Sequence, residues 1–196
     1  MAISTLKIIL ASRSPRRREL LSKLGYQFDV LAPEVSENQI AGEGPVEHVL
    51  RLSLEKARAI AAHHPKDLVI GADTIVVTNN FILGKPASEE DAISMLKMLS
   101  GKPHVVYTAL TLMILNDNIA RSDHDSTRVV FNELGQEAIL EYVKSGEPLD
   151  KAGAYGIQGM GSFLVHHYEG EFDTVIGFPA RLFKRMFEEV VSCRNH

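Results

Sequence analysis

The 196-residue sequence contains a single cysteine, Cys193, and no tryptophan. One cysteine excludes a disulfide framework and a cysteine-based metal site within one chain. The eight histidines show no metal-ligand spacing: His63–His64 and His166–His167 are adjacent pairs, and we expect the side chains of adjacent residues to diverge. We therefore expect these two pairs at the surface and no histidine or cysteine metal centre.

Long apolar runs and an excess of positive charge are also absent. The apolar run near the start, Ile8 to Ala11, is much too short for a signal peptide, and no segment approaches the length of a membrane span. The net charge of −4 excludes a broad nucleic-acid surface but allows a local basic pocket. We expect a cytoplasmic protein that binds neither membranes nor nucleic acid polymers.

Three common catalytic signatures are missing. No GxSxG element precedes a helix, and the glycine-rich segment at 146–161 is not followed by GKS or GKT, as a P-loop would be. The segment does not match the dinucleotide-binding GxGxxG pattern either. Any enzymatic activity must therefore come from another constellation of residues.

The residues that are present predict an α/β fold with a mixed, partly antiparallel sheet. The length of 196 residues suits one domain, or one elongated domain with two lobes, over residues 1–196, and the hydrophobic content of 45% is enough for a sizeable core. Strand-like and helix-like patterns alternate along the chain. The predicted strands are 7–12, 27–33, 67–77, 81–84, 104–115, 121–131 and 162–167, and the predicted helices begin near residues 15, 45, 88, 134 and 179.

Three arginines occupy an unfavourable position at the start of the first predicted helix. Ser14 is a typical N-cap and Pro15 a typical first helical residue, which places Arg16, Arg17 and Arg18 in the first turn. Each cation there costs about 0.3–1 kcal/mol against the helix dipole. An anion bound at the helix N-terminus would reverse this cost, so the pattern favours a phosphate site over a solvated basic patch.

Asp73 interrupts the otherwise apolar run LVIGADTIVV, which we expect to be a buried central strand. A buried, unpaired carboxylate is strongly unfavourable, so Asp73 requires a cation, a metal ion or a set of hydrogen-bond donors. It is either a structural carboxylate or a metal ligand or general base.

Lysines and glycines supply the remaining candidates. Lys56 borders the apolar face of the second helix, where it either contributes charge to a site or extends into solvent, and Lys85 lies in a GKP turn. The glycine-rich segment at 146–161 indicates close approach of the backbone to a ligand or to another segment. The alternative is a long flexible connection.

Eight short blocks of the sequence resemble the Maf family of nucleotide pyrophosphatases, in the same order and over about residues 10–179. They are LASRSPRRRELL, PEVSE, EKA, GADTIVV, GKP, SGKPHVVYTA, GEPLDKAGAYGIQG and VIGFP. The resemblance implies a fold similar to the inosine-triphosphate pyrophosphatases, with an elongated sheet, flanking helices and a cleft between two lobes. It also implies hydrolysis of a nucleoside triphosphate to the monophosphate and pyrophosphate, a divalent cation (Mg²⁺ or Mn²⁺), a homodimer and a link to septum inhibition.

The resemblance also assigns roles to individual residues. Asp73 matches the proposed catalytic base, and Glu37 matches an acidic residue that, with Asp73, would bind the metal ion. The positions that match the family's substrate-binding residues are Ser12, Arg16, Arg17, Lys56, Thr74, Lys85 and Gln158. Arg18 and Cys193 receive no role.

The combination of Arg16, Thr74 and Gln158 is similar to the branch that acts on dTTP and UTP. The branch for 7-methyl-GTP carries SPWRR, GSDQ and a serine–glutamate pair instead. A glutamine amide offers one donor and one acceptor to a pyrimidine edge. Arg13, Thr174 and Phe178 depart mildly from the family pattern.

Two alternative functions stay open: a 7-methyl-GTP pyrophosphatase of the same family and a nucleotide-binding regulator of septum formation.

Overall fold

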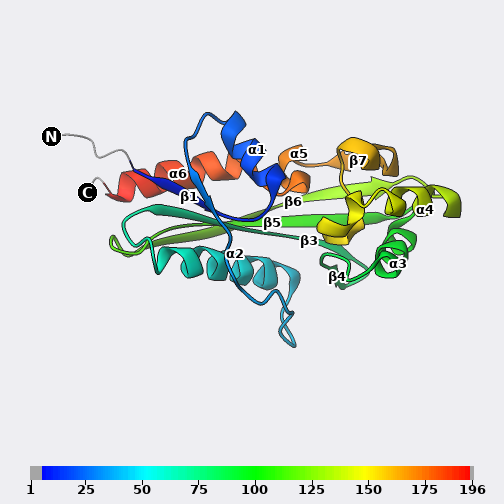
Figure 1. Cartoon of the computed structure of the whole chain (residues 1–196), viewed down its shortest axis with the longest axis horizontal. Helices are drawn as coiled ribbons and strands as arrows, with labels where there is room; N and C mark the ends of the chain where they lie inside the picture. Colours follow the sequence, from blue (N-terminus) through cyan, green and yellow to red (C-terminus); the bar gives the residue numbers. More distant parts are fainter. Residues whose placement is uncertain (1–5, 195–196) are drawn as a thin grey trace. The chain divides into compact units, whose positions relative to one another are not determined.

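A mixed seven-stranded sheet forms the centre of the computed structural model, which describes residues 6–194 (Figure 1). The strand order is β2-β1-β3-β5-β6-β7, and β4 pairs with β3. β1 pairs with β2 and β3 in parallel, whereas the β3–β4 and β6–β7 pairs are antiparallel, which confirms the predicted mixed sheet. The strands are β1 Ile8–Ala11, β2 Asp29–Leu31, β3 Leu68–Thr78, β4 Phe81–Leu83, β5 Pro103–Ile114, β6 Ile119–Phe131 and β7 Val165–Glu169.

The chain divides into two compact units. Among the described residues, unit 1 contains 6–73, 109–125 and 177–194, and unit 2 contains 74–108 and 126–176. The α-helices are α1 Pro15–Lys23, α2 Pro45–Ala61, α3 Glu89–Leu99, α4 Gln136–Lys144, α5 Phe172–Ile176 and α6 Ala180–Arg194. No helix in the described part of the chain is long and apolar enough to cross a membrane.

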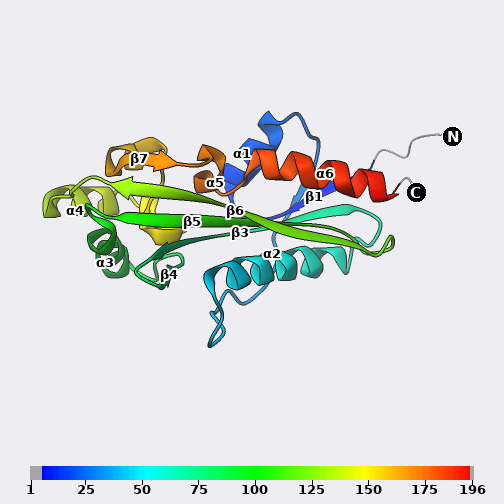
Figure 2. The same ribbon diagram turned by 180° about the vertical axis from the view of Figure 1, so that it is seen from behind.

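In unit 1, helices cover both faces of the sheet (Figures 1 and 2). Ile8 and Leu10 of β1 pack in the cluster that includes α1 and α6, whereas Ile9 and Ala11 pack in the cluster that includes α2. This alternation follows from the two-residue period of a strand. Because both faces are buried, β1 and the first half of β3 are apolar throughout, as predicted.

Gly71 allows α2 to lie directly against β3. A Cβ atom at this position would lie 2.1 Å from the Ser53 carbonyl oxygen and 2.7 Å from the Ala57 nitrogen. We expect Gly71→Ala to lower the free energy of unfolding by about 1–3 kcal/mol or more, because a backbone cannot yield as a flexible side chain does. Urea denaturation measures the change. The control is Gly84→Ala, since a Cβ atom at Gly84 has nothing within 4 Å; equal stability of the two variants would contradict this packing.

Unit 2 has a separate core that joins α3 and α4 to parts of the sheet. Its buried members include Val76 of β3, Leu96 of α3 and Tyr142 of α4. Helix α3 is capped at its N-terminus by Ser88, whose hydroxyl accepts a hydrogen bond from the Asp91 amide at 3.2 Å.

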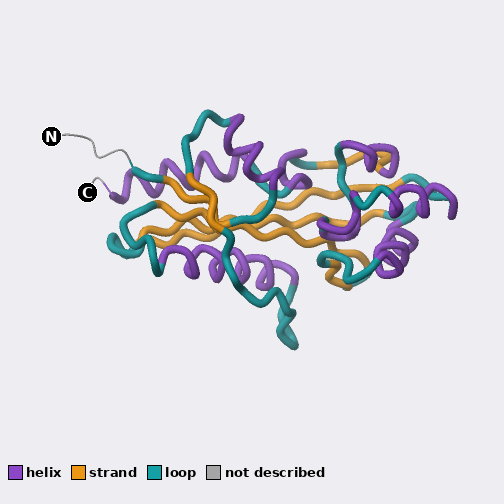
Figure 3. Tube along the Cα trace, viewed as in Figure 1, coloured by secondary structure: helices purple, strands orange, loops and turns teal. Residues whose placement is uncertain are grey.

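The glycine-rich segment in unit 2 is more ordered than a flexible connection. It forms three short 3-10 turns, η1 Glu147–Asp150, η2 Ala152–Ala154 and η3 Gly159–Leu164 (Figure 3). A Cβ atom at Gly153 would lie 2.8 Å from Val76, and one at Gly161 2.3 Å from the Gly156 carbonyl oxygen. These glycines thus allow close approach to other segments of the chain. The prediction of a strand over 162–167 is wrong for residues 162–164, which belong to η3. Helix α5 was not predicted, because five residues are too few to show a repeating helical pattern in the sequence.

His104 of β5 lies buried in unit 2, and its Nε2 is 2.8 Å from the Tyr155 hydroxyl. Burial lowers its pKa from 6.5 to about 4. The unfolded chain therefore binds this proton at a higher pH than the folded protein, so we expect the free energy of unfolding to fall by about 3 kcal/mol as the pH drops from 6.5 to 4. Denaturation at several pH values measures this slope. It should disappear in His104→Gln and persist in a variant of the exposed His63, His63→Gln; a slope unchanged in His104→Gln would refute the assignment.

Candidate active site

The turn between β1 and α1 forms the first part of the site in unit 1. Ser14 is the N-cap of α1, its hydroxyl accepting a hydrogen bond from the Arg17 amide, and Pro15 is the first helical residue, as predicted. Ser12 is buried, and its Oγ accepts hydrogen bonds from the Ser14 amide at 3.1 Å and from Arg17 Nη1 at 3.4 Å. The first turn of α1 contains no acidic residue, so its arginines and backbone amides combine their positive potential.

Arg17 connects three segments of unit 1. Its Nε donates to the Gly177 carbonyl oxygen and its Nη1 to the Ala72 carbonyl oxygen, both at 2.9 Å. Burial lowers the pKa of the guanidinium below its usual value, and the charge of Asp73 opposes this shift. Arg17 therefore has a structural role in unit 1. The contacts of Arg17 and of the half-buried Arg16 with substrate stay predictions. Arg18 is exposed.

Asp73 and Lys56 form a buried ion pair in unit 1. The Lys56 Nζ lies 2.6 Å from Asp73 Oδ1, and the two side chains are only 8% and 7% exposed. The alternative that Lys56 extends into solvent is wrong, because its helix packs closely on β3 at Gly71 and directs residue 56 toward the sheet. Asp73 thus has the cationic partner that its position in an apolar strand requires.

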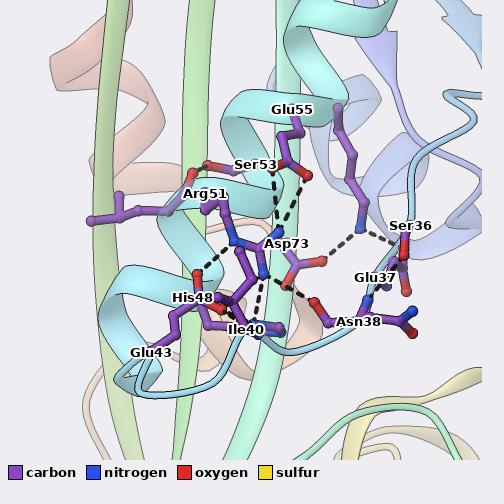
Figure 4. A network of polar contacts seen from close by, with 12 residues as sticks. Ser36, Glu37, Asn38, Ile40, Glu43, His48, Arg51, Ser53, Glu55 and Asp73 are labelled. Carbon is purple, nitrogen blue, oxygen red and sulfur yellow. Dashed lines mark hydrogen bonds and ion pairs between the residues drawn. The ribbon is translucent and has the colours of Figure 1, made fainter.

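Glu37 shares the same lysine. Its Oε1 also lies 2.6 Å from Lys56 Nζ, and its side chain is 45% exposed. Glu37 and Asp73 are shown in Figure 4 among the polar residues around α2. The structure therefore brings together two predicted metal ligands and one predicted substrate-binding residue, although Glu37 and Lys56 are far apart in the sequence from Asp73.

The second carboxylate oxygen of Asp73 is an unusual atom. Asp73 Oδ2 is buried and has no hydrogen-bond partner among the described residues. Such an atom is expected to meet an ordered water or an ion, or to act in catalysis. Within residues 6–194 no group of three or more His, Cys, Asp and Glu side chains could hold a metal ion by itself. Two carboxylates nevertheless fit Mg²⁺, which commonly binds one or two carboxylates together with substrate phosphates.

Three further predicted residues belong to unit 2. The Thr108 hydroxyl donates to the Thr174 carbonyl oxygen at 2.8 Å, so the Thr74 hydroxyl, 2.9 Å from Thr108 Oγ1, is the donor in that pair. Lys85 is exposed between β4 and α3, and Gln158 is exposed directly before η3. Their contacts with substrate stay predictions.

A second polar cluster, formed by Glu43, His48 and Arg51, was not predicted. Arg51 binds both carboxylate oxygens of Glu43, at 2.6 and 2.8 Å, and His48 Nδ1 lies 2.8 Å from Glu43 Oε2 (Figure 4). The hydrogen bonds from Arg51 lower the pKa of Glu43 to about 2 despite its burial. The sequence gives no signal for the contact between Arg51 and Glu43. It indicates only a helical ion pair between Arg51 and Glu55, which are four residues apart.

Comparison with known proteins gives a consistent set of similarities. A family model described as "Maf-like protein" matches residues 7–190. The dTTP/UTP pyrophosphatase of Koribacter versatilis is 48% identical over 180 residues, which cover 91% of this chain and 92% of the relative. The proteins of the same name from Bacillus cereus (strain AH820) and Aquifex aeolicus are 47% and 46% identical, covering 88% and 93% of this chain and 90% and 95% of their own. Among solved structures, the Staphylococcus aureus Ham1 protein covers 64% of this chain and 71% of its own, with 14% identity and a TM-score of 0.43.

Proposed function

The chain belongs to the Maf family, and from this premise we propose that it hydrolyses nucleoside triphosphates, dTTP and UTP above all, to the monophosphate and pyrophosphate. The observation that carries the proposal is the buried carboxylate of Asp73. One of its oxygens is bound by Lys56 and the other has no partner within the described chain. The oxygen without a partner can accept a proton from a bound water.

In the proposed reaction, Asp73 Oδ2 accepts a proton from the attacking water. The water oxygen forms a bond to the α-phosphorus, the bond from the α-phosphorus to the α,β-bridging oxygen breaks, and pyrophosphate leaves with the bonding electron pair. Lys56 donates a hydrogen bond to Asp73 Oδ1 at 2.6 Å and supplies the opposite charge that a buried carboxylate requires. General base catalysis of this kind typically contributes about 10²–10⁴-fold.

Charge neutralisation is the second part of the proposal. Glu37 and Asp73 would hold a divalent cation together with phosphate oxygens of the substrate. When bound, Mg²⁺ or Mn²⁺ would neutralise the charge that develops on those oxygens. Ser12, Arg16 and Arg17 at the N-terminus of α1 would bind the phosphates, since helix N-terminal amides and guanidinium groups both favour anions.

Substrate preference is proposed to depend on Thr74, Lys85 and Gln158 of unit 2. The experiment is a panel of dTTP, UTP, CTP and 7-methyl-GTP with Mg²⁺ or Mn²⁺, with pyrophosphate release as the readout. We expect dTTP and UTP to have the highest kcat/KM. A preference for 7-methyl-GTP would move the protein to the other branch, and tight UTP binding without pyrophosphate release would favour a nucleotide-binding regulator. Homodimer formation belongs to the same proposal and is measured by analytical ultracentrifugation.

A further inference from the structure

We propose that Arg51 is a positioning residue that holds Glu37 in place through the loop before α2. This inference rests on the proposed function, because it concerns the carboxylate expected to act beside Asp73. Residues 32–44 form no helix or strand, and Figure 3 shows them as loop. A carboxylate carried by such a segment reaches a defined position only if other contacts fix the backbone.

Arg51 makes contacts of the required kind. Its Nη2 donates to the carbonyl oxygen of Asn38, the residue directly after Glu37, at 3.1 Å. The same guanidinium binds Glu43 through two nitrogens, a planar bidentate arrangement that fixes direction as well as distance. Glu43 in turn accepts a hydrogen bond from the Ile40 amide at 3.3 Å. The loop from Asn38 to Glu43 is thus attached to α2 at two points (Figure 4).

Lys56 provides the contact that links this attachment to the active site. It lies on the same helix, five residues after Arg51, and binds the Glu37 carboxylate. One helix therefore holds the backbone of Asn38 through Arg51 and the side chain of Glu37 through Lys56. Lys56 also binds Asp73, so its ammonium group is held at one position. The Glu37 carboxylate reaches that position only when the backbone of the loop is already fixed beside α2.

The burial of Glu43 indicates that the attachment is strong. Its side chain is only 8% exposed, yet it carries a charge that Arg51 and His48 satisfy from α2. Arg51 is itself 21% exposed and has a second partner in Glu55. Removing the guanidinium would leave a buried carboxylate without its main partner, so the loop should move away from α2.

A double-mutant cycle between Arg51 and Glu37 tests this inference. In the wild-type background we expect Arg51→Met to lower kcat/KM for UTP by about 10- to 100-fold, as is typical when a residue that orients a metal ligand is lost. In a Glu37→Gln background the same substitution should change kcat/KM less than about twofold, because its effect passes through Glu37. Glu43→Gln, which breaks the attachment from the loop side, should repeat this pattern. The control is Arg58→Met, an exposed arginine on the same helix.

Hydrogen exchange provides a readout independent of activity. The amides of residues 37–43 should exchange faster in Arg51→Met than in the wild type and in Arg58→Met, while the core amides of β3 keep their protection. An equal loss of kcat/KM in both Glu37 backgrounds, or unchanged exchange in the loop, would overturn the inference. If wild-type protein released no pyrophosphate from any nucleotide, the proposed function would fail, while loop exchange would still decide whether Arg51 fixes the segment around Glu37.

Discussion

Replacing Asp73 by Asn is expected to lower kcat for UTP by about 10²–10⁴-fold, the range that a general base contributes. Asparagine has nearly the same shape and can still accept a hydrogen bond from Lys56 at the position of Oδ1. It cannot take a proton from water, so turnover should fall far more than nucleotide binding, which Ser12, Arg16 and Arg17 would still support. Steady-state kinetics together with calorimetric titration of UTP separates the two effects.

The control for this experiment is Asp29→Asn, which removes an exposed carboxylate of β2 that pairs with Lys7. Its kcat should stay at the wild-type value. If Asp73→Asn also kept near-wild-type turnover, Asp73 would not be the base, and its role would be limited to balancing the charge of Lys56.

Replacing Lys56 by Met should affect both stability and activity. The substitution leaves the buried Asp73 carboxylate without its cation, a change that typically costs about 3–5 kcal/mol of unfolding free energy. Turnover should fall as well, because Asp73 loses the hydrogen bond that holds its Oδ1 in place. Urea denaturation and pyrophosphate release measure the two losses.

A double variant identifies the cause of the instability. Lys56→Met combined with Asp73→Asn removes both charges, so it should regain part of the lost stability but none of the turnover. Lys66→Met, at an exposed position before β3, is the control and should resemble the wild type. If the double variant were less stable than Lys56→Met alone, the buried ion pair would not explain the loss.

The parts of the site that the sequence predicts are those with a local signal. Ser14 and Pro15 mark the start of α1 because capping depends on neighbouring residues, and the structure confirms both. Asp73 is conspicuous because a charged residue inside an apolar strand requires a partner. The sequence does not identify that partner, because helical periodicity does not say whether a lysine at the border of an apolar face turns inward or outward.

The parts that the sequence did not predict depend on the path of loops. Arg51 and Glu43 meet because residues 32–44 return to α2, and a segment without periodicity gives no indication of where it returns. Glycine density likewise indicated close approach in the segment at 146–161 but not the three 3-10 turns that it forms. The predicted fold class was confirmed because strand and helix periods are local, whereas the cleft between two lobes stays a prediction.

Hydrolysis of UTP in ¹⁸O-labelled water tests the central claim most directly. The wild-type protein is incubated with UTP and Mg²⁺, the products are separated, and mass spectrometry measures the ¹⁸O content of each product. Attack of water on the α-phosphorus places one ¹⁸O atom in UMP and none in pyrophosphate. Label in pyrophosphate instead, or formation of UDP and phosphate, would contradict the account.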